Sequence, residues 1–121
     1  MGITGHRRER LADQILGEVA EMIVGELKDP RIGFATITRV ELSPDLRYAR
    51  VLISVLGDDE AQQKTLEGLS SAAGYVRREI ARRLRIRRAP EVVFALDYGA
   101  EEALKIEALL QKLKRPGSPD L

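Results

Sequence analysis

The segment LEGLSSAAGYVRREIARRL, residues 66–84, decides how this chain folds. Its apolar residues recur at helical steps without a gap, which predicts a helix from about Asp59 to Arg85. Gly68 and the small residues from Ser70 to Gly74 lie inside this pattern, and a glycine in a helix-like pattern marks a possible break. The segment is therefore either one long helix or two shorter helices in succession.

Strand patterns lie on both sides of this helical segment. Phe34–Leu42 and Tyr48–Leu56 are rich in Thr, Ile and Val. Between them, Ser43-Pro44-Asp45-Leu46 has proline and aspartate where a turn needs them, which predicts an antiparallel hairpin. After the helical segment, Ala89-Pro90 and the β-rich run Glu91–Leu96 predict a third strand.

Amphipathic helices are predicted at both ends of the chain. An apolar stripe predicts a first helix from Arg7 to about Lys28, which Asp29-Pro30 ends. The stripe consists of Leu11, Ile15, Val19, Met22 or Ile23, and Leu27. A last helix is predicted from about Ala100 to Leu113, with flexible ends at residues 1–6 and 114–121. Residues 7–113 then form a single two-layer α+β domain.

The composition removes most kinds of catalytic and metal site. The chain has 121 residues, no cysteine and one histidine, His6. Thiolate metal sites, cysteine nucleophiles and most acid–base machinery are therefore excluded. The acidic run Asp58-Asp59-Glu60 stands where a helix is predicted to begin, and we interpret it as a helix cap rather than a metal site. We expect no enzyme activity, no metal and no cofactor.

The hydropathy pattern predicts a cytoplasmic protein. The longest apolar stretches, such as Val51–Leu56, are far shorter than the roughly 20 residues that cross a bilayer. The N-terminus carries Arg7, Arg8 and Arg10 where an export signal would need an apolar core.

Positive charge is concentrated in one short segment. The whole chain has a formal net charge of +1, from 20 basic and 19 acidic residues. Between Arg77 and Arg88, however, seven arginines stand with a single acidic residue, Glu79. Such local concentration indicates an anionic partner.

A helical projection divides these arginines into three groups. With the apolar residues facing the core at about 100° per residue, Arg78, Arg82 and Arg85 fall on the opposite face. Arg77 and Arg83 flank the apolar face, and Arg87 and Arg88 extend the patch past the helix end. A solvated helix face is the alternative interpretation. Because like charges at positions i and i+4 repel unless a partner neutralises them, we favour nucleic-acid binding.

The predicted order of elements fits one class of RNA-binding module. A KH domain clamps the nucleic-acid backbone with a tight glycine loop between two helices. The Gly-x-x-Gly sequence at residues 2–5 lies at the wrong end of the chain, and Ala72-Ala73-Gly74 stands at the right place. An RNA-recognition motif is disfavoured, because the chain has five aromatic residues and no RNP1-like string.

Six motifs in this order resemble the bacterial ribosome-binding factor A family, over Arg7–Leu113. They are the arginine-rich start of the first helix, LKDPRIG at 27–33, VELSPDL at 40–46, YARV at 48–51, AAGYVR at 72–77 and LRIRRAPE at 84–91. The resemblance implies a type II KH fold in which an Ala-x-Gly kink replaces the glycine loop. Ala72, Ala73 and Gly74 match that kink, so two helices are expected to meet there.

The resemblance also implies what such a protein does. It would be a non-enzymatic factor that binds the free small (30S) ribosomal subunit and its 16S rRNA. It would assist late maturation and processing of that RNA and support cold adaptation. A cytoplasmic monomer without a cofactor is expected, with maturation GTPases that act on the same subunit as further partners.

The candidate RNA-binding residues are all arginines, taken from the basic segment and from the family motifs nearer the N-terminus. They are Arg77, Arg78, Arg82, Arg85, Arg87, Arg88, Arg31, Arg7 and Arg8. Two alternative functions are also consistent with the sequence. One is a protein-binding adaptor that uses the acidic region 91–107 and the last helix, and the other is a hydrolase with a carboxylate-held metal.

Overall fold

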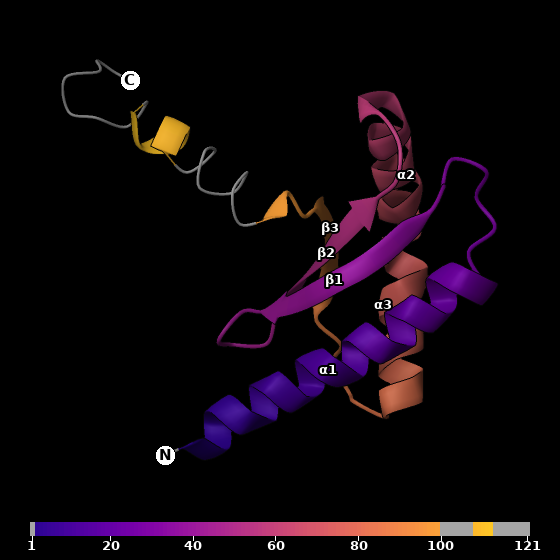
Figure 1. Cartoon of the computed structure of the whole chain (residues 1–121). Coiled ribbons are helices and arrows are strands. Elements are labelled where there is room, and N and C mark those ends of the chain that lie inside the picture. The colour runs from indigo at the N-terminus through magenta and orange to yellow at the C-terminus, as the bar shows by residue number, and fades with distance from the viewer. Residues whose placement is uncertain (1, 100–107, 113–121) are drawn as a thin grey trace.

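The computed structural model describes residues 2–99 and 108–112 (Figure 1). Within residues 2–99, the regular elements are α1 (Gly2–Gly25), β1 (Ala35–Leu42), β2 (Tyr48–Val55), α2 (Asp59–Ser71), α3 (Ala73–Leu84) and β3 (Glu91–Leu96). This order confirms the predicted α+β fold class, and the bounds of the third strand agree with the prediction. The predicted last helix, from about Ala100 to Leu113, lies mostly outside the described residues. The part of it that is described, residues 108–112, is helical.

The three strands of the described chain form one sheet in the order β1-β2-β3. β1 and β2 are antiparallel, as the hairpin prediction requires, and β2 and β3 are parallel. The turn between β1 and β2 is held by local bonds, because Asp45 Oδ1 accepts from the Ser43 hydroxyl at 2.8 Å and from the Arg47 N–H at 3.1 Å. Leu46 takes a left-handed conformation with φ of 61°.

A single core joins the helices to the sheet. Two parallel strands need a crossover connection, and α2 and α3 provide it between β2 and β3. Figure 1 shows α2 and α3 arranged end to end, with α1 running obliquely beside α3. The core side chains come from α1, α2, α3, β2 and β3, and include Ile15, Val19, Met22, Val51, Ile53, Leu69, Val76, Ile80, Val92 and Phe94.

Helix α1 differs from the prediction at both ends. It begins at Gly2 and not at Arg7, because the apolar stripe that predicts the helix begins only at Leu11 and does not mark the turns before it. It ends at Gly25, before Asp29-Pro30. There the N–H groups of Glu26 and Leu27 both donate to the Met22 carbonyl oxygen, at 2.8 and 2.9 Å, and close the last turn.

The long helical segment is broken at Ala72, which confirms the expectation of two helices meeting at Ala72–Gly74. Ala72 has φ of −90° and ψ of 0°, outside helical geometry. Its N–H donates to the Leu69 carbonyl at 3.0 Å, and its carbonyl accepts from the Val76 N–H at 2.9 Å, so the backbone stays bonded through the break. Gly74 lies inside α3, so the break itself falls on an alanine.

The segment between α1 and β1 packs on the side of α2. The Gly33 N–H donates to the buried Thr65 hydroxyl at 3.1 Å. One helical turn further along, a Cβ at Gly68 would lie 2.8 Å from Ile32 Cγ1, closer than real Cβ contacts. Gly68 is therefore needed for close approach of residues 29–33, and not for a helix break.

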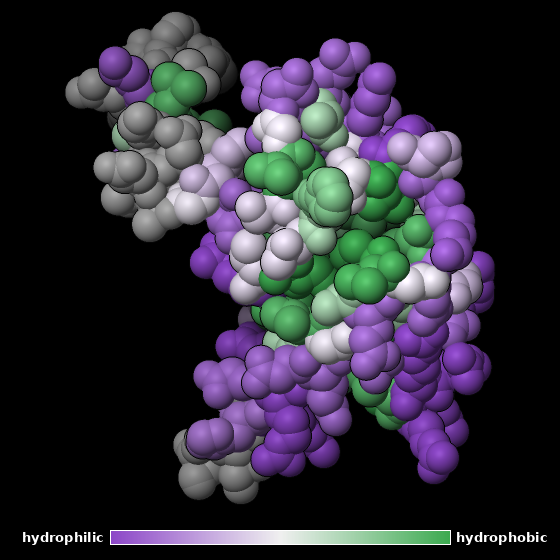
Figure 2. Space-filling view, turned by 45° about the vertical axis from the view of Figure 1, so that its right-hand side comes forward, coloured by the Kyte–Doolittle hydropathy of each residue, from purple (hydrophilic) through white to green (hydrophobic). Residues whose placement is uncertain are grey.

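The described surface carries several exposed apolar side chains. Figure 2 shows one face on which hydrophilic side chains surround a central apolar area. Val24, Phe34 and Leu56 are among the large apolar residues that stay exposed. No helix in residues 2–99 or 108–112 combines the length and the apolar character that spanning a membrane requires.

Candidate nucleic-acid interface

Helix α3 has an apolar face and a basic face, as its pattern predicts. Val76 and Ile80 are fully buried against the core. Arg78 and Arg82 are exposed on the opposite side. Arg82 Nη2 donates to Glu79 Oε1 at 2.7 Å, yet its side chain is 68% exposed. Both guanidinium groups are therefore accessible to a partner in solution.

The basic surface continues around the end of α3. Arg85 ends the helix in a left-handed conformation, with φ of 56° and ψ of 43°. The Ile86 N–H then donates to the Ala81 carbonyl at 3.1 Å, which closes the helix end. Arg85, Arg87 and Arg88 are exposed in this turn. We call the exposed residues Arg78, Arg82, Arg85, Arg87 and Arg88 the α3 basic surface.

Arg83 belongs to the fold and not to this surface. Its guanidinium contacts three carboxylates, Glu26 at 2.6 Å, Glu79 at 3.1 Å and Glu18 at 3.3 Å. Only 18% of its side chain is exposed. Hydrogen bonding to Arg83 and then to the Tyr75 hydroxyl lowers the pKa of Glu26. Glu18 contacts Arg83 from within α1, and Glu26 contacts it from just after the end of that helix. The expectation that Glu79 is the only acidic residue that pairs with the seven arginines is therefore wrong.

Arg77 combines an exposed charge with a structural bond. Its Nε donates to the carbonyl oxygen of Ala89 at 3.1 Å, which ties α3 to the start of the following strand. Its side chain is nevertheless exposed. Arg77 therefore lies at the border between the α3 basic surface and the turn that leads to β3.

Arg31 lies beside the helix break, but its charge is already paired. Its Nε and Nη2 bind Asp29 at 3.0 and 2.6 Å, and Nη2 also donates to the Ser71 hydroxyl at 3.0 Å. Bonds from the Arg31 side chain and backbone lower the pKa of Asp29 to about 2. Arg31 thus fastens the segment before β1 to the end of α2, and it contributes less free positive charge than the sequence suggests.

Arg7 and Arg8 lie on a different part of the molecule. Arg7 is exposed and Arg8 is half-buried, near the start of α1. Helix α1 meets Arg83 of α3 through Glu18. About 16 Å of helix separates Arg7 from Glu18, at 1.5 Å per residue. Arg7 and Arg8 are therefore not brought together with the α3 basic surface by any contact in the described structure.

The kink residues leave backbone accessible beside the basic face. Ala72 and Ala73 are half-buried and Gly74 is exposed. A Cβ added to Gly74 would meet only Arg78 Nη1, at 3.5 Å. A ligand can therefore approach the backbone here within reach of an arginine.

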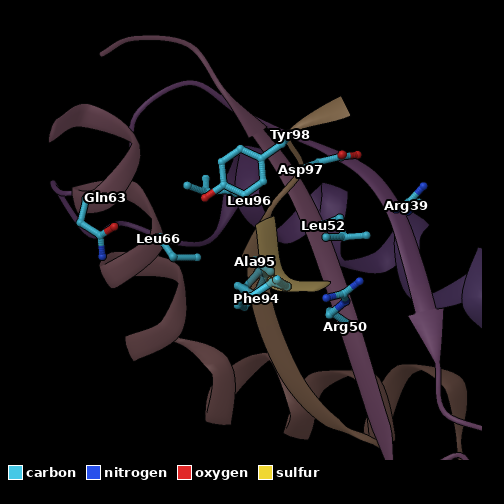
Figure 3. A pocket seen from close by; sticks show the side chains of 11 residues that line it. Arg39, Arg50, Leu52, Gln63, Leu66, Phe94, Ala95, Leu96, Asp97 and Tyr98 are labelled. Carbon is cyan, nitrogen blue, oxygen red and sulfur yellow. The ribbon is translucent and has the colours of Figure 1, made fainter. Parts of the chain in front are cut away.

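A separate hollow lies on the sheet side of the molecule. It has a volume of about 480 Å³, and Figure 3 shows Gln63 and Leu66 of α2 on one side and Arg39 and Arg50 on the other. Both arginines pair with Glu41, at 3.0 and 2.9 Å. Among the described residues, no three imidazole or carboxylate groups are placed to hold a metal ion. Asp58 caps α2 by accepting from the Ala61 N–H at 2.9 Å, as the sequence indicates.

Two residues near the basic segment were missed in the sequence. Arg47 and Tyr48 line one hollow together with Arg77 and Arg88. They stand roughly 30 to 40 residues earlier in the chain, where β2 begins, so no linear charge pattern joins them to the cluster. The available signal was the turn at residues 43–46, which places the next residues at the end of a hairpin.

The chain is similar to one family along almost all of its length. The profile described as "Ribosome-binding factor A" matches residues 7–110. A ribosome-binding factor A from Caldanaerobacter subterraneus subsp. tengcongensis is 43% identical over 116 residues, which cover 95% of each chain. The crystal structure of ribosome-binding factor A from Thermus thermophilus superposes with a TM-score of 0.68 at 29% identity, covering 77% of this chain and 98% of that one.

A further related structure is described together with its binding partner. It is a homology model of the Thermus thermophilus ribosome binding factor A, fitted into the cryo-electron microscopy map of a complex with the 30S subunit. It superposes with a TM-score of 0.60 at 32% identity, covering 73% of this chain and 92% of that one.

Proposed function

The chain belongs to the ribosome-binding factor A family, and from this premise we propose that it binds the free 30S ribosomal subunit through its 16S rRNA. The family consists of ribosome-binding factors and not of enzymes. The relative fitted into the map of a 30S complex, 32% identical to this chain, supports the choice of partner.

The observation that carries the proposal is the α3 basic surface. Five exposed arginines follow one face of α3 and the turn after it, with Glu79 as the acidic residue among them. A guanidinium binds two phosphate oxygens at once, which makes arginine well suited to an RNA backbone. Arg83 is left out of this surface, because three carboxylates already neutralise it. Arg31 serves instead to position the segment before β1 against the end of α2, through its bond to the Ser71 hydroxyl.

The mechanism we propose is positioning of RNA without chemical change. The arginines neutralise phosphates and hold the register, while the Ala72–Gly74 kink, where Gly74 is exposed, lets the RNA backbone approach closely. Phosphate contacts carry no direct sequence code. Recognition then depends on the shape of the immature RNA.

The time and place of action form the finer part of the proposal. We assign the protein to late maturation and processing of 16S rRNA in the cytoplasm, acting as a monomer and with most effect in the cold. Maturation GTPases that act on the same subunit are the further partners that this assignment suggests.

Sedimentation tests the proposal directly. Purified protein is mixed with free 30S subunits or with assembled 70S ribosomes and centrifuged through sucrose gradients. We expect it to co-migrate with the free subunit, to be released as salt is raised, and to be largely absent from 70S ribosomes. Equal binding to both particles, or salt-resistant binding, would instead favour the protein-binding adaptor.

A further inference from the structure

A polar hollow separate from that of Figure 3 lies where the hairpin turn, the start of β3 and helix α3 meet. Its volume is about 430 Å³, within the range of about 300 to 1,000 Å³ typical of small-ligand sites. Three of its lining residues are arginines from three separate segments, namely Arg47, Arg77 and Arg88. Tyr48, Asp45 and Glu91 also line it.

The walls of this hollow are fixed by hydrogen bonds to backbone carbonyl groups. The Glu91 N–H donates to the Arg47 carbonyl at 2.8 Å, and Tyr48 pairs with Glu91 in the parallel ladder. On the α3 side, Arg77 Nε donates to the Ala89 carbonyl at 3.1 Å. The three segments therefore hold fixed positions relative to one another, as a preformed site requires.

The groups that line the hollow are available for binding. Arg47, Arg77 and Arg88 are exposed, and in the described structure no carboxylate lies within ion-pair distance of any of them. The Tyr48 residue is 53% exposed, so its ring can accept a stacked partner. Arginines bind phosphate, and an exposed aromatic ring stacks against the flat face of a base.

The two carboxylates narrow the chemical class of the ligand. Asp45 is kept charged by the Ser43 hydroxyl and the Arg47 N–H, which lower its pKa. Together with Glu91 it disfavours a purely anionic ligand such as a polyphosphate. The amino group of a base can instead donate to a carboxylate, as it does in recognition of cytosine.

We propose that this hollow holds one unstacked nucleotide of single-stranded RNA, with its phosphate at Arg47, Arg77 and Arg88 and its base against the Tyr48 ring. The inference deepens the proposed function by adding a single-strand pocket next to the α3 basic surface, with which it shares Arg88. It gives the protein a means to prefer unpaired RNA over a duplex, since a paired base cannot enter.

Substitution of the ring tests the base contact. Binding of a fluorescent 12-nucleotide single-stranded RNA to the full chain is measured by anisotropy, for the native protein, Tyr48→Leu and Tyr48→Phe. Tyr98→Leu is the matched control, because Tyr98 is 52% exposed and lies outside this hollow. We expect Tyr48→Leu to weaken binding by about fivefold to 100-fold, as loss of one stacked base predicts. Tyr48→Phe keeps the ring and Tyr98→Leu removes none from the hollow, so each should change the affinity by less than about twofold.

Substitution of the arginine tests the phosphate contact independently. Arg47→Gln should lower the slope of log affinity against log salt by about 0.7, the value for one phosphate on a single strand. Arg39→Gln, which removes the same charge from a position outside the hollow, should leave the slope unchanged. Thermal unfolding of each variant verifies that it is folded.

The possible outcomes separate this inference from the function on which it rests. If the native protein binds 30S subunits, but Tyr48→Leu and Arg47→Gln bind RNA as the controls do, the pocket is wrong and the function stands. The pocket is equally wrong if these variants lose affinity only for the subunit, since the hollow would then contact a folded part of the subunit and not single-stranded RNA. If the native protein binds neither RNA nor subunits, the proposed function itself fails.

Discussion

At the scale of single residues, the same residue type serves different ends in different surroundings. Of the seven arginines between residues 77 and 88, Arg83 is held by three carboxylates, whereas Arg78 is exposed to solvent on the outer face of α3. The surroundings of the glycines differ in the same way. A Cβ at Gly68 would meet side chains of the packed segment before β1, whereas a Cβ at Gly17 would meet no atom within 4 Å beyond its neighbours and its own helix backbone.

Gly68→Ala should therefore destabilise the fold although alanine is the better helix former. The added methyl would lie 2.8 Å from Ile32 Cγ1 and 3.3 Å from Arg31 Cβ. We expect a net loss of up to about 2 kcal/mol, since overpacking costs about 1 to 3 kcal/mol and the propensity gain returns about 1 kcal/mol. Gly17→Ala, in the open, should gain about 0.5 to 1 kcal/mol. Urea unfolding measures both, and equal stability changes would contradict the close approach at Gly68.

Asp29 should titrate well below an ordinary aspartate. Hydrogen bonds from the Arg31 side chain and then its backbone N–H lower the Asp29 pKa from 3.8 to about 2. Because the folded pKa is the lower one, the unfolded chain binds more protons between these values. The stabilising contribution of Asp29 is therefore complete above about pH 4 and is lost as the pH falls through about 2.

Carboxyl NMR of the native protein measures this titration. A midpoint near 2 is expected for Asp29, and Arg31→Gln should move the midpoint toward 3.8. The same residue in urea-unfolded protein serves as the control. A native midpoint that stays near 3.8 would show that the bidentate pair is not formed in solution.

At the scale of elements, periodicity predicts what is buried and says less about where helices end. The hairpin, the third strand and the core faces of α1 and α3 follow from spacing, because burial imposes a period of 2 or 3.6 on the sequence. The start of α1 at Gly2 does not follow, since the apolar stripe in the sequence begins only at Leu11. The break at Ala72 leaves the apolar spacing intact, so only the small residues and the family motif indicated it.

The candidate site was predictable only in part for a related reason. A run of arginines is visible in any sequence, but the carboxylates that neutralise Arg83 arrive from α1 through tertiary packing. The hollow at Arg47 and Tyr48 likewise exists only because β3 pairs with β2 in parallel. Contacts between segments that are far apart in the chain have no local signature.

The α3 basic surface makes a prediction about binding to the subunit. Replacing Arg78, Arg82 and Arg85 together with glutamine should weaken 30S binding and flatten its salt dependence. Removing one phosphate-binding arginine lowers the log–log slope by about 0.7 to 0.9, so a decrease of up to about 2 to 3 is expected for the triple variant. Folding should change little, because the Arg82 side chain is 68% exposed and Glu79 keeps its ion pair with Arg83.

A second triple variant controls for charge. Arg39, Arg50 and Lys64 are exposed and pair with Glu41 or Glu60, so replacing them with glutamine removes the same positive charge elsewhere. That variant should keep the native slope. If both triples lower the slope equally, binding depends on overall charge and not on α3.

At the scale of the whole molecule, the proposed function predicts a defect that grows as temperature falls. Mispaired RNA helices melt more slowly in the cold, so a protein that only holds RNA shape matters most there. Cells lacking this protein should grow poorly at low temperature and accumulate free 30S subunits that carry unprocessed 16S ends. Growth curves, sucrose gradients and RNA end mapping at a warm and a cold temperature measure this.

Complementation sharpens the test in cells. The native gene should restore cold growth, and the Arg78, Arg82, Arg85 triple variant should not, although it accumulates to the same level. A defect of equal size at both temperatures, or one confined to the large subunit, would count against a role in 30S maturation.

The parallel pairing of β3 with β2 also determines when a newly translated chain becomes competent. Translation delivers the hairpin first, then α2 and α3, and β3 last of the three strands. Until then β2 has one open edge, and the bond between Glu91 and Arg47 is absent. A nascent chain shorter than about 91 residues therefore has no completed nucleotide pocket, so it cannot capture RNA through that pocket while its own synthesis is unfinished.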